Sequence, residues 1–164
     1  MEEYPKVSFR LFNATDGLLI SLWITNQAYL TFFRHNAVMP SFEDCSRYPT
    51  WSNNIVMMVV DEAGSTIGMV NGYYANWRNR VIHAGILLTE EAQHRGYGHA
   101  AFAQWVFYLA ERFGFRKIVA EIVEERLVKP MERFGFEVEG VYKSECLING
   151  EYTDEYRLAY FGGI

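Results

Sequence analysis

The stretch "QHRGYGHA" at residues 93–100 decides how this chain is interpreted. It follows an apolar run, "VIHAGILLT", and precedes an alanine- and aromatic-rich run of helical period. Gly96 and Gly98 carry no side chains, so backbone N–H groups can approach a diphosphate closely, and the positive end of the following helix points at the same charge. Arg95 adds a cation. The stretch therefore predicts a phosphate-binding turn between a strand and a helix.

Two better-known phosphate loops do not fit this stretch. A P-loop needs a lysine and then a serine or threonine after its last glycine, whereas His99 and Ala100 stand there. The dinucleotide fingerprint needs three glycines early in a parallel sheet, whereas this turn has two and follows an expected antiparallel meander. From the two glycines alone, a turn without any ligand remains the alternative.

The hydrophobic pattern predicts a mixed α/β domain. Strands are expected at residues 6–12, 55–61, 66–76, 80–89, 115–123, 136–148 and 151–161. Helices are expected within residues 14–33, with Thr15 or Asp16 as N-cap, at residues 98–113, with Gly114 as C-cap, and at residues 124–135, where Pro130 confines the regular part. Residues 34–54 read as a long loop with a short helix at most. We expect one mostly antiparallel sheet with a parallel crossover over residues 81–123.

Composition narrows the function classes. The 164 residues are 50% hydrophobic and 21% charged, which suits a single domain over residues 1–164. No apolar run approaches the roughly 20 residues of a membrane span, and the acidic start is unlike a secretory leader, so we expect a cytoplasmic protein with no membrane partner. The net charge of -5 argues against a nucleic-acid partner. Cys45 and Cys146 lack metal-site spacing, so we expect no metal and two buried thiols.

The loop residues resemble a known signature. Gln93, Gly96 and Gly98 match the Q/R-x-x-G-x-G/A pattern of the GNAT superfamily of N-acetyltransferases, and the expected order of elements is similar over essentially the whole chain. The segment "ERFGF" at residues 132–136 and the ending after it look like those of spermidine acetyltransferases and of N-terminal acetyltransferases of ribosomal proteins. The resemblance implies a GNAT-like sheet flanked by helices, acetyl-CoA as donor with coenzyme A as product, and acetyl transfer to a primary amine.

The resemblance also implies where the cofactor binds. The pyrophosphate would sit on backbone N–H groups of residues 94–99, and the pantetheine arm would pair with the end of the preceding strand, which splays from the next one. The implied cofactor-binding residues are Leu87, Leu88, Thr89, Gln93, His94, Arg95, Gly96, Tyr97, Gly98 and His99. A backbone N–H near Leu88 would stabilise the oxyanion.

The catalytic base is expected at His83. An aliphatic ammonium, with a pKa near 10.4, must lose a proton before it can attack, and an imidazole suits that task. In the similar enzymes a glutamate often holds this place on the strand that leads into the loop, and here the place is His83. Alternation puts Gly85 on the same face, where it could leave room for substrate. Tyr73 and Tyr74 on the neighbouring strand are candidates to line the substrate site or hold water, with a place in the core as the alternative. The alternative for His83 is a hydrogen bond within the sheet.

Two positions depart from the family pattern. Met131 stands where many members have a tyrosine that protonates the thiolate, and Glu124 stands where an asparagine often touches the cofactor arm. Glu124 is more in keeping with a helix cap. These departures keep open a second function, a non-catalytic acyl-CoA-binding domain for sensing or assembly. Transfer of a different acyl group is open as well.

The acceptor site is expected between the loop at residues 34–54 and the final hairpin. That hairpin is acidic, with Glu137, Glu139, Glu145, Glu151, Asp154 and Glu155. Such a charge could attract a protein N-terminus, a polyamine or another small amine, although a solvated charged face is the alternative. The aromatic residues of "YYANW" and "EYRLAYF" leave a homodimer open.

Overall fold

The computed structural model describes residues 4–26, 29 and 41–162. Within them one sheet runs in the order β1-β2-β3-β4-β5-β7-β6. Its strands are β1 (Ser8–Leu11), β2 (Ile55–Val60), β3 (Thr66–Asn76), β4 (Val81–Leu88), β5 (Lys117–Ile122), β6 (Glu137–Ile148) and β7 (Glu151–Phe161). The α-helices are α1 (Gly17–Ile24), α3 (Phe42–Ser46), α4 (Tyr97–Phe113) and α5 (Val128–Phe134). Short 3-10 turns are η1 (Ala14–Asp16), η3 (Tyr48–Asn53), η4 (Glu90–Ala92) and η5 (Glu125–Leu127).

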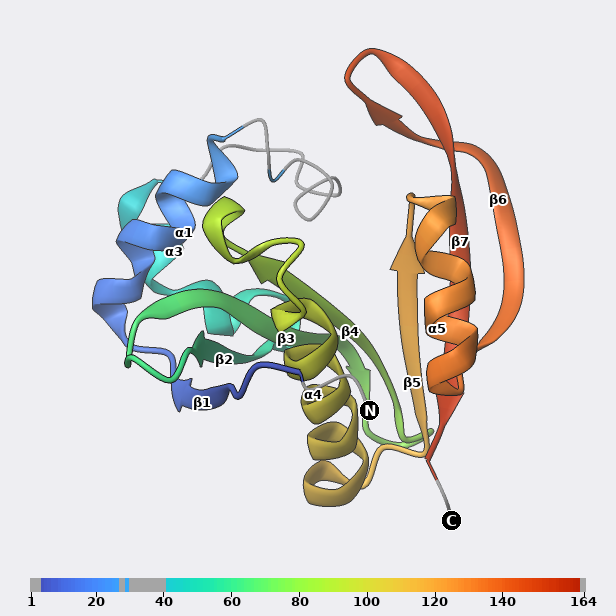
Figure 1. Cartoon of the computed structure of the whole chain (residues 1–164), viewed down its shortest axis with the longest axis horizontal. Coiled ribbons are helices and arrows are strands. Elements are labelled where there is room, and N and C mark those ends of the chain that lie inside the picture. The colour runs from blue at the N-terminus through green and yellow to red at the C-terminus, as the bar shows by residue number, and fades with distance from the viewer. Residues whose placement is uncertain (1–3, 27–28, 30–40, 163–164) are drawn as a thin grey trace.

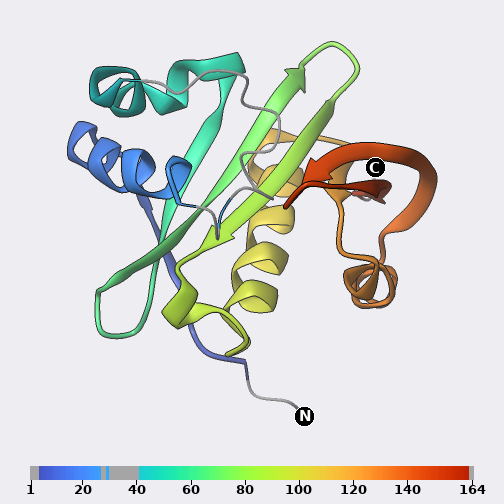
Figure 2. The ribbon, with the colours of Figure 1, turned by 90° about the horizontal axis from the view of Figure 1, so that it is seen from above.

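The expected mixed α/β fold is confirmed. Every pair of neighbouring strands is antiparallel except β4 and β5, which run parallel and are connected along the chain through α4. Helices α1 and α3 lie on one face of the sheet and α4 on the other (Figures 1 and 2). Part of the expected long loop, residues 34–40, lies outside the described residues, and the rest forms α3 and η3. Within the described ranges, no helix is both long enough and apolar enough to span a membrane.

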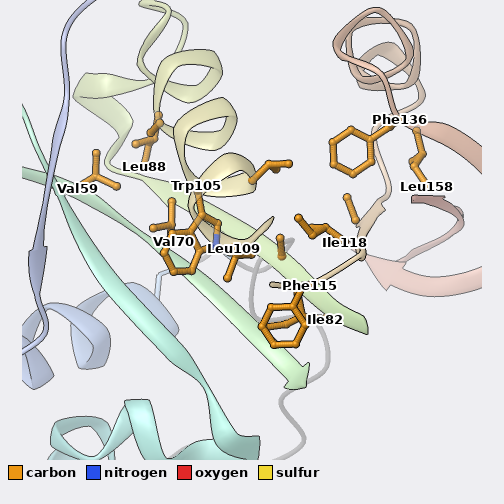
Figure 3. Packing of buried hydrophobic residues seen from close by; sticks show 14 of the residues in the cluster. Val59, Val70, Ile82, Leu88, Trp105, Leu109, Phe115, Ile118, Phe136 and Leu158 are labelled. Atoms are coloured by element: carbon orange, nitrogen blue, oxygen red, sulfur yellow. The ribbon is translucent and has the colours of Figure 1, made fainter. Parts of the chain in front are cut away.

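The larger core lies between the sheet and α4 and α5. Trp105, in the middle of α4, is fully buried, and its indole Nε1 donates to the backbone oxygen of Asn71 on β3 at 3.0 Å. Leu109 from the same helix packs in this cluster, and Figure 3 shows it beside Trp105 and across from Ile82 of β4. Gly72 makes this contact possible, because a Cβ there would lie 2.6 Å from the Ile82 side chain. The helix is thereby held against β3 and β4.

The smaller core lies on the opposite face, beneath α1 and α3. It joins Ile20 and Trp23 of α1 to Met58 of β2 and Leu87 of β4. Gly17 lets the two helices approach, because a Cβ there would lie 2.4 Å from the Ser46 Oγ. Cys45 is buried in this cluster, as the sequence predicts.

The helix ends show where local expectations fail. Asn13, rather than Thr15, caps η1, whereas Asp16 is the N-cap residue of α1, as predicted, but makes no side-chain capping bond there. Its carboxylate instead accepts two hydrogen bonds from Arg10, at 2.7 and 2.8 Å. Burial pushes the pKa of Asp16 upward, but the bonds from Arg10 and the Asn13 N–H outweigh burial and leave that pKa below its ordinary value. The prediction for Gly114 is confirmed, with a φ of 68° at the end of α4.

The end of the chain follows the sequence closely. Pro130 is the third residue of α5, within the first turn, where a missing N–H breaks no helical bond. Asn149 and Gly150 link β6 to β7 with φ of 52° and 83°, the double positive φ of a type I′ turn. Glu124 is the N-cap residue of η5, as expected, but its side chain makes no capping bond. Its carboxylate accepts from Arg126 Nε at 2.7 Å.

We expect Trp105→Phe to lower the free energy of unfolding by about 2 kcal/mol, since it leaves a cavity in the larger core and removes the donor to Asn71. Urea denaturation gives the value. Trp77→Phe is the matched control, because Trp77 is half exposed and should cost less than about 0.5 kcal/mol. Equal losses would contradict a central role for Trp105.

Candidate active site

Strands β4 and β5 start side by side and then separate. Their parallel register comprises Val81 with Lys117, Ile82 with Ile118, and His83 with Val119. Beyond His83, β4 continues to Leu88 along β3, while β5 continues to Ile122 along β7. Figure 1 shows the two strands diverging toward their carboxyl ends. The sheet therefore opens at the point where β4 leads into the glycine-containing loop.

The last residues of β4 direct their peptide groups in alternating directions. Thr89 N donates to Ile67 O at 2.8 Å, so Thr89 faces β3. Alternation then turns Leu87 toward β3 as well, and the peptide groups of Ile86 and Leu88 toward the opening. Gln93 Nε2 donates to Leu88 O at 3.0 Å. The glutamine of the loop signature thus ties the loop to this edge, and the N–H groups of Ile86 and Leu88 face the side where β5 has moved away.

The loop itself ends in a helix N-terminus. His94 and Gly96 adopt left-handed backbone with φ of 58° and 85°, and Gly96 is the N-cap residue of α4. The first helical bond runs from Ala100 N to Gly96 O at 3.2 Å. A helix leaves its first N–H groups without intrahelical partners, here those of Tyr97, Gly98 and His99. This arrangement of N–H groups and dipole suits a diphosphate.

The N-terminal segment packs on the same loop. The ring of Tyr4 stacks on His99, with centroids 4.2 Å apart and planes 17° apart. A Cβ on Gly96 would lie 3.0 Å from the Pro5 Cδ. On its other side, His99 lies edge-on to Phe134 of α5, at 6.1 Å. The first turn of α4 is therefore held between residues from the chain start and from α5.

His83 lies where the opening begins. Its side chain is 13% exposed. The rings of Tyr73 and Tyr74 have centroids 5.4 and 5.6 Å from its ring. Consecutive strand residues normally point to opposite faces, but the β3 register shifts between Tyr73 and Asn76, and Tyr74 has a φ of 51°. This bulge brings both tyrosines to His83, and their role in lining the substrate site or holding water stays a prediction.

A line of alternating charges runs across the sheet from His83. Glu121 Oε2 of β5 lies 3.3 Å from His83 Nδ1, and Glu121 Oε1 accepts from Arg157 Nη1 of β7 at 3.4 Å. Arg157 Nε also lies 3.5 Å from Glu139 Oε2 of β6, and Glu139 pairs with Lys117. The hydrogen bond from Lys117 is the main cause that holds the pKa of Glu139 below its ordinary value. We call these five residues the charge ladder.

Two residues at the opening between β4 and β5 were not predicted from the sequence, Glu121 and Ile86. The glutamate inside the apolar strand "KIVAEI" was a usable signal for the first. Met131 is half-buried and packs against the larger core. Arg95 is exposed beside the loop, and its guanidinium lies over the Tyr97 ring at 5.6 Å. The described residues include no cluster of three or more His, Cys, Asp or Glu suited to a metal.

The hairpin acids are less available than their number suggests. Glu139 pairs within the charge ladder, and Asp154 accepts from Lys143 Nζ at 2.7 Å. Glu155 is buried and accepts from the Cys146 thiol at 3.3 Å. Pairing with cations of the same hairpin and sheet weakens the attraction that these acids can exert on a polycation.

Known acetyltransferases resemble this chain in sequence pattern and in fold. The model of the acetyltransferase (GNAT) domain family matches residues 6–137. Spermidine N-acetyltransferase from Vibrio cholerae, solved in complex with CoA and spermine, superposes with a TM-score of 0.84 at 22% identity, over 95% of both chains. Spermidine/spermine N-acetyltransferase SpeG from the same organism, solved with manganese ions, gives 0.81 at 23% identity, over 96% of this chain and 93% of that one. No curated protein sequence matches significantly.

We expect Gly96→Ala to destabilise the protein more than Gly64→Ala. Both glycines have a φ near 85°, which costs an alanine about 1–2 kcal/mol, but only at Gly96 would the new methyl also meet Pro5. Urea denaturation of the two variants isolates that contact. Equal losses would mean that the chain start does not rest firmly on the loop.

Proposed function

We propose that this chain, which belongs to the GNAT acetyltransferase family and is an acetyl-CoA-dependent acetyltransferase, acetylates a primary amine with His83 as general base. The observation that carries the proposal is the opening between β4 and β5, which places His83 at its origin and the glycine loop at its end. Acetyl-CoA supplies an activated thioester at this opening. The remaining tasks fall to the protein.

The proposed donor site uses backbone groups. The N–H groups at the start of α4 would bind the diphosphate, as Gly96 allows the left-handed turn and Gly98 leaves the first helical turn uncovered. The N–H groups of Ile86 and Leu88 would pair with the pantetheine arm. Ile86 takes the place expected for Leu87, whose peptide group faces β3. The Leu88 N–H is our candidate for the oxyanion donor. Arg95 would add positive charge beside the phosphates.

The reaction needs a general base for the acceptor amine more than it needs a general acid for the departing thiolate. His83 would take the proton of the ammonium group, after which the amine nitrogen has a lone pair for attack. Met131 cannot return a proton to the departing thiolate, but a thiol pKa near 8.5 lets the thiolate leave without an enzymatic acid. Because Glu139, Asp154 and Glu155 pair with other side chains of this chain, we favour an acceptor with one positive charge. A peptide N-terminus carries one positive charge, and spermidine, which carries several, serves as the polycationic acceptor for comparison.

Donor binding can be tested without knowing the acceptor. We expect acetyl-CoA at about 100 times its Kd to stabilise the protein by about 2.7 kcal/mol in thermal melts. Gly98→Ala should keep the fold, since its Cβ meets only Leu88 Cδ1 at 3.6 Å, yet bind acetyl-CoA about tenfold more weakly. Binding of acetyl-pantetheine, which has no diphosphate, should not change in this variant. A parallel loss for both ligands would place the diphosphate elsewhere.

The base role predicts a specific kinetic loss. His83→Gln should lower kcat by about 100-fold or more with the better of two acceptors, spermidine or a short peptide with a free N-terminus, as measured by thiol release. The Kd for acetyl-CoA should stay within about twofold, because His83 is not part of the donor site. An unchanged kcat would remove His83 from the chemistry. Tight acetyl-CoA binding with no transfer to either acceptor would instead favour the non-catalytic binding domain.

A further inference from the structure

We propose that Glu121 is a positioning residue for His83. It holds the imidazole with Nδ1–H toward its carboxylate and so leaves Nε2 to take the proton from the acceptor amine. This inference rests on the proposed function, in which His83 is the base. It adds a residue from β5, a strand in which the sequence analysis named no site residue.

The contacts of Glu121 divide between its two oxygens. Oε2 lies 3.3 Å from His83 Nδ1, and Oε1 accepts from Arg157 Nη1 at 3.4 Å. Within the described part of the chain, His83 Nδ1 is buried and has no partner with good hydrogen-bond geometry. Buried polar atoms in native proteins nearly always have a partner. Glu121 Oε2 is already within reach, so a small rotation of the imidazole would form the bond.

The surroundings of His83 make this carboxylate effective. Glu121 has a side chain only 11% exposed, so its charge acts on His83 with little screening by water. From β3 His83 meets the uncharged rings of Tyr73 and Tyr74, and from β7 Arg157 reaches it only through Glu121. Glu139 and Lys117 lie farther along the charge ladder. Arg157 favours the ionised form of Glu121, which can accept but not donate a hydrogen bond.

The proton transfer then has a fixed direction. The N–H bond of the ammonium group breaks, its proton joins His83 Nε2, and the electron pair stays on the amine nitrogen. His83 carries two protons at that moment, and the negative charge of Glu121 stabilises the imidazolium. Glu121 gains no proton in this step. Loss of the Nε2 proton to water returns His83 to its starting state.

The first test needs no turnover and no variant. We expect nitrogen-15 NMR of the unliganded protein at a pH where His83 is neutral to show Nδ1 protonated and Nε2 unprotonated. In Glu121→Gln the uncharged amide should shift His83 toward the other tautomer or a mixture. His83 protonated at Nε2 in both proteins would overturn the proposal.

Kinetics supply the second test, with spermidine or the peptide as acceptor. Glu121→Gln should lower kcat by about 10- to 100-fold with little change in KM. Glu139→Gln removes a carboxylate from the same charge ladder without touching His83, and should keep kcat within about twofold. Equal kinetic losses in the two variants would overturn the positioning role and assign the effect to the ladder as a whole.

The two tests separate this inference from the proposed function. If His83→Gln leaves kcat unchanged, the base assignment fails, while the NMR result still decides whether Glu121 sets the tautomer. If His83→Gln lowers kcat but Glu121→Gln does not, the base assignment stands and Glu121 loses its role.

Discussion

The separation of β4 from β5 is the constraint on which the rest of the structure depends. Two parallel strands that part leave one row of peptide groups without ladder partners, and buried peptide groups need partners. The sheet limits the deficit because each strand keeps its other neighbour, β3 for β4 and β7 for β5. Gln93 satisfies the Leu88 oxygen from outside the sheet. What remains on the β4 edge is a short backbone surface ready for an extended ligand.

The two faces of the sheet contribute differently to this opening. The face toward α4 and α5 is apolar, and Trp105 fixes α4 so that its N-terminus meets the end of β4. On the other face, the apolar cluster under α1 and α3 ends at β4, and the charge ladder continues from there across β5, β7 and β6. Packing on one face therefore positions the backbone groups of the donor loop. On the other face, Glu121 of the charge ladder lies beside the side chain proposed to handle the proton.

Sequence reasoning predicted the elements well and the contacts less well. Alternating and helical periods gave the strands and α4, because these patterns follow directly from burial. The loop residues were found because glycines mark backbone that other residues adopt at a cost. A glutamate inside an apolar strand marks Glu121 as unusual, but its partner His83 could not be predicted, because β4 and β5 are adjacent for only a few residues and no local pattern encodes that register. The bulge at Tyr74 was not predicted for a similar reason. Asn13 rather than Thr15 caps η1, because Asn13 and Asp16 form a capping box.

The packing of Tyr4 and Pro5 against the loop has a practical consequence. Tyr4 and Pro5 contact the first turn of α4, so a displacement of the chain start would be transmitted to the proposed donor loop. A purification tag fused ahead of residue 4 would therefore lie near the loop proposed to bind the diphosphate rather than on a remote surface. Affinity for acetyl-CoA measured on tagged and untagged protein would then differ for reasons unrelated to the catalytic residues.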